Sequence, residues 1–158
     1  MRTDVTPRFD VTVDQVPDRT IASITSEATI GSVGSVVQGA LRTLSEVVGQ
    51  ADAFGEVGPG LIVHEMGSGT MTLEVFVPIT RRFDTPPGVG IRTLDGGRVA
   101  ATVHEGPYDQ IGAAYQAVTA WIADHREIGS GPPREYYLND PSEDPEIVPR
   151  TRVEFPIG

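Results

Sequence analysis

The sequence predicts an α+β domain made of duplicated β-α-β-β units, with two helices packed on an antiparallel sheet and a ligand cleft between the two halves. Three observations support this class. Four segments recur in the same order at spacings of 73 to 79 residues, each copy contains one stretch with helical apolar spacing, and the flanking stretches alternate like strands. A single domain over residues 1–158 is expected, with repeats at roughly 8–80 and 88–157.

The recurring segments follow the boundaries of the expected elements. They are Arg19 to Thr25 with Arg98 to His104, Ser32 to Val48 with Asp109 to Ile122, Gly58 to Met66 with Gly131 to Asn139, and Thr72 to Ile79 with Thr151 to Ile157. Because one unit is too small to bury a good core alone, the two copies are expected to pair into one sheet with a seam between them. Such a seam is a natural place for a ligand.

Each copy is expected to open with a β-hairpin. Phe9, Val11 and Val13 alternate with polar residues, and a Val-Pro-Asp turn then leads to a second alternating run over 20–25. In the second copy, the run over 89–94 is followed by Asp-Gly-Gly, which is typical of a hairpin turn.

Apolar residues at helical spacing predict one helix in each copy. In the first, the stripe runs from Val33 to Val48, and in the second from Ile111 to Ile122. The second stripe includes Tyr115 and Trp121, for which core packing is the default role.

Strand alternation divides the last strands between two faces of the sheet. Leu73, Val75 and Val77, with their counterparts in the second copy, are expected to face the helices. The same alternation groups Ile62 with His64 and Glu135 with Tyr137. The face away from the helices is therefore expected to carry carboxylates, an arginine, a histidine, a tyrosine and a phenylalanine, drawn from His64, Glu74, Phe76, Tyr137, Arg152 and Glu154.

Composition excludes several classes of function. The net charge is −10 and all 12 basic residues are arginine, which disfavours direct nucleic-acid binding and rules out lysine Schiff-base chemistry. There is no cysteine, no apolar stretch of the ~20 residues that cross a bilayer, and no secretory leader, so a cytoplasmic protein without membrane contact is expected. No phosphate loop, dinucleotide fingerprint or His-Glu-x-x-His pair is present, so neither a cofactor nor a metal is expected.

Several motifs together resemble a known family. They are His-Glu-Gly-Pro-Tyr at 104–108, Tyr115 and Trp121 on the following helix, Pro-Pro-Arg-Glu-Tyr-Tyr-Leu-Asn-Asp-Pro at 132–141, and the closing Val-Glu-Phe-Pro-Ile at 153–157. This combination resembles the GyrI-like small-molecule-binding domain, which includes the effector-binding domains of AraC-type and multidrug-sensing transcription regulators. The second half matches strongly and the first half more loosely.

The resemblance implies a cleft lined by aromatic residues around a central acidic residue, and that role carries over to Glu135. Relatives with a DNA-binding segment place it outside this domain, and no segment here is long enough to supply one, so a stand-alone form of the domain is expected. The expected ligand is an aromatic or amphipathic small molecule, with a cation as one option.

Glu135 is the central candidate, because a carboxylate on an interior strand should either carry a raised pKa or meet a cation. Tyr137 and Tyr108 would supply aromatic walls, and Trp121, His64, Phe76 and Glu154 complete the candidate set. Arg152 is expected to pair with Glu135 or Glu154, and a pair with Glu135 would cancel the field that a cationic ligand needs.

Three classes of function remain open at this stage. The first is a binding module that senses, carries or sequesters a small molecule. The second, also implied by the resemblance, is a hydrolase of strained cyclopropane-containing electrophiles, with Glu135 as general base and Tyr137 or His64 as proton donor. The third is a protein partner, either a regulator or DNA gyrase, which rests on similarity of fold alone.

Overall fold

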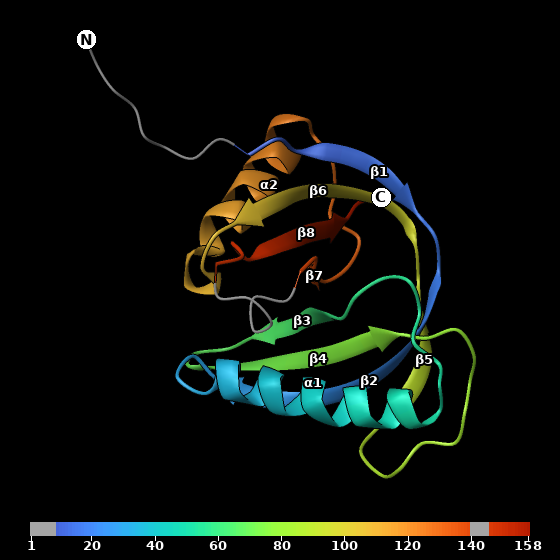
Figure 1. Ribbon diagram of the computed structural model, residues 1–158. Coiled ribbons are helices and arrows are strands. Elements are labelled where there is room, and N and C mark those ends of the chain that lie inside the picture. The colour runs from blue at the N-terminus through green and yellow to red at the C-terminus, as the bar shows by residue number, and fades with distance from the viewer. Residues whose placement is uncertain (1–8, 140–145) are drawn as a thin grey trace.

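The computed structural model describes residues 9–139 and 146–158 and contains the expected mixture of strands and helices (Figure 1). In chain order the elements are β1 (Thr12–Val16), β2 (Arg19–Thr29), α1 (Val33–Gln50), β3 (Gly60–Met66), β4 (Thr70–Pro78), β5 (Gly90–Leu94), β6 (Gly97–Glu105), the 3-10 turn η1 (Tyr108–Gln110), α2 (Gly112–Asp124), β7 (Arg134–Tyr137) and β8 (Arg150–Pro156). The predicted α+β class, with two helices on an antiparallel sheet, is confirmed.

The strand order is the same when read from either end of the sheet. The eight strands lie in the order β1-β6-β8-β7-β3-β4-β2-β5, which is unchanged when β1–β4 are exchanged with β5–β8. The registers agree, since Ile21 pairs with Pro78 and Val99, 78 positions later than Ile21, pairs with Pro156. At the centre, β3 and β7 place Leu61 directly opposite Glu135. The sequence repeat itself stays a prediction.

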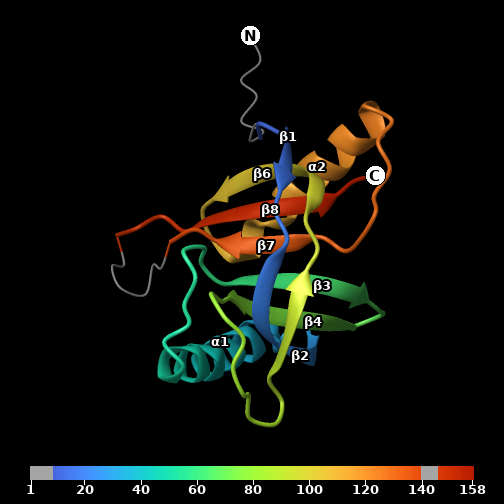
Figure 2. The same cartoon turned by 90° about the vertical axis from the view of Figure 1, so that its right-hand side faces the viewer.

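The predicted hairpins are wrong, because the two halves exchange their first strands. β1 pairs with β6, and β5 pairs with β2. Figure 2 shows the long segments β1–β2 and β5–β6 both running across the same side of the sheet. Neither segment folds back at its two-residue link. Each continues instead as one bent strand that joins the two halves.

Local chemistry at the two links explains this exchange. Pro17 cannot adopt the positive φ that a two-residue hairpin turn requires, so the chain continues in an extended direction. The second link passes so close to the first that a Cβ on Gly96 would lie 2.2 Å from the Val16 carbonyl oxygen. The Gly96 amide donates to Asp18 Oδ1 at 2.7 Å, which ties the two links together.

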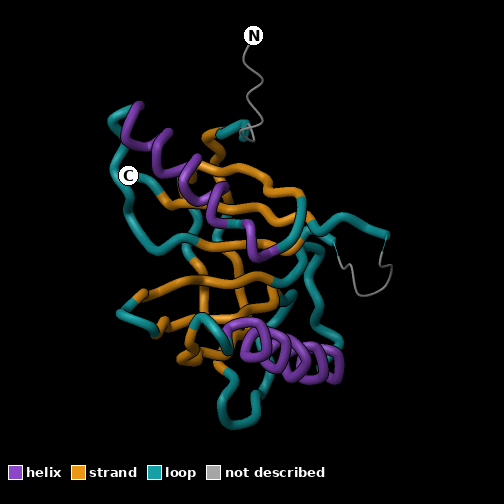
Figure 3. Tube along the Cα trace, turned by 90° about the vertical axis from the view of Figure 1, so that its left-hand side faces the viewer, coloured by secondary structure: helices purple, strands orange, loops and turns teal. Residues whose placement is uncertain are grey.

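Both helices cover the same face of the sheet, one over each half (Figure 3). Helix α1 packs on β2 and β4, and α2 packs on β6 and β8. Leu44 and Val48 of α1 are fully buried against Leu73 and Val75, because the apolar stripe of the helix meets the apolar face of the strands. We call this side of the sheet the helix face.

The opposite face has a small apolar centre flanked by two groups of charges. The apolar centre consists of Ile21, Ile62, Phe76, Leu94 and Tyr136. On one side Glu74 accepts two hydrogen bonds from Arg92, at 2.6 and 2.8 Å. On the other side Arg152 pairs with Asp14 and with Glu154, both at 2.8 Å. The Arg92–Glu74 pair joins the exchanged strand β5 to β4, and the Arg152–Asp14 pair joins the exchanged strand β1 to β8.

In the part of the chain that the structure describes, no helix combines the length and apolar character needed to cross a bilayer.

Candidate functional site

Glu135 lies on the short central strand β7, at the middle of the helix face. It pairs with Leu61 on one side and Val153 on the other. Leu61 belongs to the core beneath α1, so Glu135 points to the same side of the sheet as the two helices. Only 8% of the residue is exposed. The prediction that Tyr137, and with it Glu135, faces away from the helices is therefore wrong.

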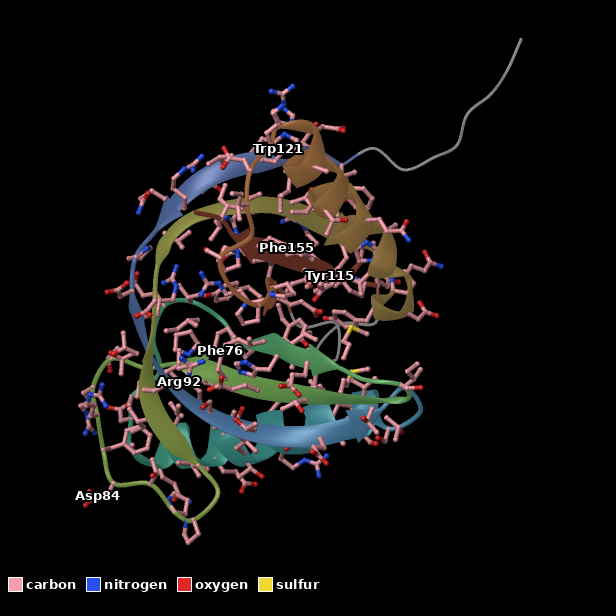
Figure 4. The ribbon with its side chains drawn as sticks, turned by 180° about the vertical axis from the view of Figure 1, so that it is seen from behind. Phe76, Asp84, Arg92, Tyr115, Trp121 and Phe155 are labelled. Atoms are coloured by element: carbon pink, nitrogen blue, oxygen red, sulfur yellow. The ribbon has the colours of Figure 1, made fainter. Side chains whose placement is uncertain are left out.

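Tyr115 of α2 covers the Glu135 carboxyl group. Its hydroxyl donates a hydrogen bond to Glu135 Oε2 at 2.5 Å, and its ring packs edge-on against Phe155 with ring centroids 5.6 Å apart. Figure 4 shows Tyr115 and Phe155 beside α2 and apart from Phe76 and Arg92. The helical stripe predicted that Tyr115 is packed inside, but did not predict its polar contact.

Burial dominates the electrostatics of Glu135. Removal from water raises the pKa of the Glu135 carboxyl group, and the Tyr115 hydrogen bond and the nearby charge of His104 oppose that rise only in part. In the described residues no ion pair involves Glu135. Burial, and after it the Glu135 charge, also raises the pKa values of Tyr115 and Tyr137, so both tyrosines remain hydroxyl donors.

Tyr137 and Tyr108 form an aromatic pair next to Glu135. Tyr137 follows Glu135 by two positions on β7 and shares its face, and the Tyr108 ring meets it edge-on at 5.5 Å between centroids. Tyr108 is 43% exposed, so the pair reaches the surface. We call Glu135, Tyr115, Tyr137 and Tyr108 the Glu135 site.

The loop that carries Tyr108 is held in place by backbone contacts. His104 Nε2 lies 2.9 Å from the Pro107 carbonyl oxygen, so this nitrogen donates. Gly106 has a φ of +128°, a conformation that favours glycine, and its amide donates to the Pro149 carbonyl. The Gly-Pro-Tyr motif is therefore a turn that presents Tyr108 to Tyr137.

The other predicted site residues are not near Glu135. His64, Phe76, Arg152 and Glu154 lie on the opposite face, because they alternate with residues that face the helices. Arg152 pairs with Glu154 and Asp14, so it does not neutralise Glu135. Trp121 lies at the other end of α2 from Tyr115, where its ring stacks on His125 at 4.1 Å (Figure 4).

The residues on the opposite face have local structural partners. His64 Nε2 contacts Glu74 at 2.8 Å, Phe76 meets Tyr136 edge-on at 5.3 Å, and Glu154 lies 3.2 Å from Arg134. Burial acts to raise the pKa of Glu74, but hydrogen bonds from Arg92, Ser23 and His64 outweigh it and lower the pKa to about 2. The charges on this face therefore bind one another.

The predicted candidate set left out Tyr115, which belongs to the Glu135 site, and His104, whose charge acts on Glu135. One signal for Tyr115 was available, since a tyrosine in a buried helical stripe needs a partner for its hydroxyl. His104 was identified only within the motif at 104–108. Its contribution depends on the pairing of β6 with β8, which sequence spacing alone does not reveal.

The arrangement around Glu135 combines one carboxyl group with tyrosine rings. Among the described residues, no group of three His, Asp or Glu side chains is arranged to hold a metal ion. One ionisable carboxyl group, surrounded by three tyrosines, offers a single negative charge with aromatic walls.

Comparisons with known proteins agree with this architecture. The sequence model of the GyrI-like small molecule binding domain matches residues 9–157. Among solved structures, the C-terminal domain of EcmrR superposes with a TM-score of 0.79 at 14% identity, covering 95% of this chain and 98% of that one. No curated protein sequence matches the chain.

Two further structures share the fold. A hydrolase from Listeria innocua gives a TM-score of 0.68 at 12% identity, covering 98% of this chain and 94% of that one. SAV2435 bound to tetraphenylphosphonium gives 0.61 at 17% identity, covering 94% of each chain. At these identities the likeness shows the fold alone. The match over residues 9–157 shows the family, and the chain belongs to the GyrI-like small-molecule-binding domain family.

Proposed function

We propose that this domain binds lipophilic aromatic cations at Glu135, which it would sense, carry or sequester. The observation that carries the proposal is a buried carboxyl group covered by a tyrosine hydroxyl and without an ion pair in the described residues. The other buried carboxylates and the buried arginine of the described residues, namely Glu74, Glu154 and Arg134, each lie in an ion pair, whereas the charge of His104 acts on Glu135 without forming one. Glu135 is the exception, and a cationic ligand would supply the missing charge.

The expected energies favour replacement of the Tyr115 hydroxyl by an aromatic cation at Glu135. A unit cation about 4 Å from an ionised carboxylate gains on the order of 4 kcal/mol at an effective dielectric near 20. Stacking on tyrosine adds about 0.5–2 kcal/mol for each ring, while displacing the Tyr115 hydroxyl loses about 1.5–3 kcal/mol. The balance is favourable provided that the cation is aromatic and leaves its water behind. A small hydrated cation lacks both advantages.

The comparisons support the choice of a probe. SAV2435 shares this fold, and its structure contains tetraphenylphosphonium, a lipophilic aromatic cation. The EcmrR domain that superposes on 95% of this chain is the C-terminal domain of its protein. Tetraphenylphosphonium is therefore a reasonable first ligand to test.

At a pH below the raised pKa of the carboxyl group, binding of tetraphenylphosphonium is expected to release a proton from Glu135. Because the carboxyl pKa is raised in the folded protein, the group must lose its proton before it can pair with a cation. Below that pKa the apparent affinity should fall by about tenfold for each unit of pH, and above it the affinity should be constant. Isothermal titration calorimetry in buffers of different ionisation enthalpy measures the released proton directly.

The pH series should stay above the ordinary pKa of Glu74. The stability that ionised Glu74 contributes is fully present above pH 4.5 and is lost as the pH falls toward about 2. The fold should therefore persist above pH 4.5. Glu135→Gln serves as the control and should show neither proton release nor pH dependence. Affinity of the native protein that stays constant as the pH is lowered to 4.5, which lies below the raised pKa of Glu135, with no proton released there, would contradict a cation bound at this carboxyl group.

Hydrolysis is a second candidate, favoured by the raised pKa of Glu135 and its contact with Tyr115. A desolvated carboxylate is a stronger base than one in water, and Tyr137, the predicted proton donor, lies two positions along β7 on the same face, while the Tyr115 hydroxyl contacts the carboxyl group directly. His64 cannot be that donor, because it lies on the opposite face. Mass spectrometry of a cyclopropane-containing electrophile incubated with the protein tests this function. Turnover should disappear in Glu135→Gln, whereas stoichiometric binding without product would exclude it.

The suggested association with DNA gyrase or with a regulator stays a prediction, since no described contact bears on it.

A further inference from the structure

We propose that Thr151 is a second recognition point of the Glu135 site, so that the preferred ligand is an aromatic cation that also carries a neutral hydrogen-bonding group. The inference rests on the proposed function, because it concerns the same site. It names the chemical class of the ligand more narrowly and identifies a residue that determines specificity.

Thr151 lies beside Glu135 on the helix face. On β8 it pairs directly with Tyr137 of β7 and with His104 of β6, and Val153, two positions later, pairs with Glu135. Thr151 is therefore the diagonal neighbour of Glu135, at a distance of about 7–8 Å between backbones. A ligand that lies over β7 and contacts Glu135 can reach Thr151 with a group at that distance from its charge.

The Thr151 hydroxyl is buried without a hydrogen-bond partner among the described residues. The residue is fully buried, yet its Oγ1 makes no hydrogen bond to another described residue. A buried hydroxyl normally has a partner, because its desolvation is otherwise uncompensated. The nearby His104 Nε2 is already engaged with the Pro107 carbonyl oxygen.

A second buried threonine shows the usual arrangement. Thr102 lies on the neighbouring strand β6, and its hydroxyl donates to the Asp10 carbonyl oxygen at 2.9 Å. Both threonines are buried on the helix face in the same half of the sheet, but of the two only Thr102 hydrogen-bonds through its hydroxyl to another described residue. Valine would fill the position of Thr151 equally well, since it has nearly the same shape. A hydroxyl at Thr151 without a partner among the described residues therefore supports a contact with a ligand there.

The hydroxyl can donate or accept, so the matching ligand group is neutral and polar, such as a hydroxyl, an ether or a carbonyl. Another cation would be unsuitable there, because nothing beside Thr151 would balance it. Tyr115 covers Glu135, and Tyr137 is the direct cross-strand neighbour of Thr151, so a ligand that displaces Tyr115 and packs beside Tyr137 would approach both recognition points.

The test compares tetraphenylphosphonium with the three positional isomers of (hydroxyphenyl)triphenylphosphonium, which have the same charge and a similar aromatic surface. We expect at least one isomer to bind the native protein about five- to tenfold more tightly than tetraphenylphosphonium. Thr151→Val should abolish this preference and leave the affinity for tetraphenylphosphonium unchanged. Thr151→Ser, which keeps the hydroxyl, should retain the preference. Calorimetry measures all the affinities.

Thr102→Val is the matched control, because it also removes one buried threonine hydroxyl. It should lower the unfolding midpoint, since it breaks a real hydrogen bond, and should keep the ligand preference. Thr151→Val should be at least as stable as the native protein. A preference that survives in Thr151→Val, or a larger loss of stability there than in Thr102→Val, would overturn the inference.

The failures of the two proposals are distinguishable. If tetraphenylphosphonium binds through Glu135 but no hydroxylated isomer binds more tightly, only the role of Thr151 is excluded. If none of the four cations binds the native protein, both proposals fail.

Discussion

Replacing Glu135 with glutamine is expected to weaken tetraphenylphosphonium binding by about 100- to 1,000-fold. The substitution removes the one negative charge in the Glu135 site and leaves the three tyrosines in place. The expected loss corresponds to most of the attraction between a unit cation and a carboxylate in a partly desolvated site. Only the stacking on the tyrosines should remain. Calorimetry at a pH where the native carboxyl group is ionised measures the change.

The fold should tolerate this substitution. Glutamine keeps an oxygen that accepts the Tyr115 hydroxyl hydrogen bond, and it removes an ionisable group that burial disfavours. The unfolding midpoint should therefore be equal to or above that of the native protein. Glu46→Gln on the exposed side of α1 changes the net charge equally, so it controls for long-range attraction. Similar affinities in the native protein, Glu46→Gln and Glu135→Gln would exclude Glu135 as the binding carboxylate.

Replacing Gly96 with alanine is expected to lower the free energy of unfolding by about 3 kcal/mol or more. The added Cβ would lie 2.2 Å from the Val16 carbonyl oxygen and 2.5 Å from the Pro17 carbonyl carbon. Both are backbone atoms of the other crossing segment, so neither can move away as the tip of a side chain could. The two links would have to separate, and the pairing of β1 with β6 and of β5 with β2 would be disturbed. Urea unfolding followed by circular dichroism measures the loss.

Gly90→Ala provides the matched control for this substitution. Gly90 lies at the start of β5, and a Cβ there meets nothing within 4 Å. Alanine in a strand is otherwise slightly favourable, by roughly 0.5–1 kcal/mol relative to glycine. Equal stabilities of the two variants would show that the links do not cross as described.

The sequence predicted the helices and strands well because their signals are local. The apolar stripe ending at Val48 identified α1, and alternation identified strands such as β4 and β8. The pairing of the first strands could not be predicted in this way. A two-residue link flanked by alternating residues is the usual signal for a hairpin, and the exchange depends on a close approach at Gly96 that involves residues 78 or more positions apart.

The candidate site was predicted only in part, for a related reason. Tyr137 and Tyr108 were placed with Glu135 through the family resemblance, and the structure brings them together. The face of the sheet was assigned wrongly, because alternation gives the relative orientation of residues within one strand but not between β7 and β8. The register, which sets Glu135 opposite Val153 rather than opposite Glu154, decides the face. Arg152 was therefore expected beside Glu135 although it lies on the other side.

The ion pairs of the exchanged strands also bear on how the chain avoids a competing fold. If β1 folded back on β2 through its two-residue link, Val16 would pair with Arg19 and Asp14 would lie opposite Ile21, where Arg92 lies in the structure. Asp14 would then take the place of Arg92, the cation that pairs with Glu74. Likewise, a hairpin of β5 and β6 would set Arg92 opposite Val99 and beside Arg152.

In both local hairpins, like charges would meet, whereas the exchanged strands bring opposite charges together. Repulsion between partly buried charges disfavours the simpler pairing even though it closes a shorter loop. Four charged side chains thereby discriminate between two arrangements with the same strands and the same apolar pattern. The two halves consequently interlock, and neither can detach without breaking the sheet of the other.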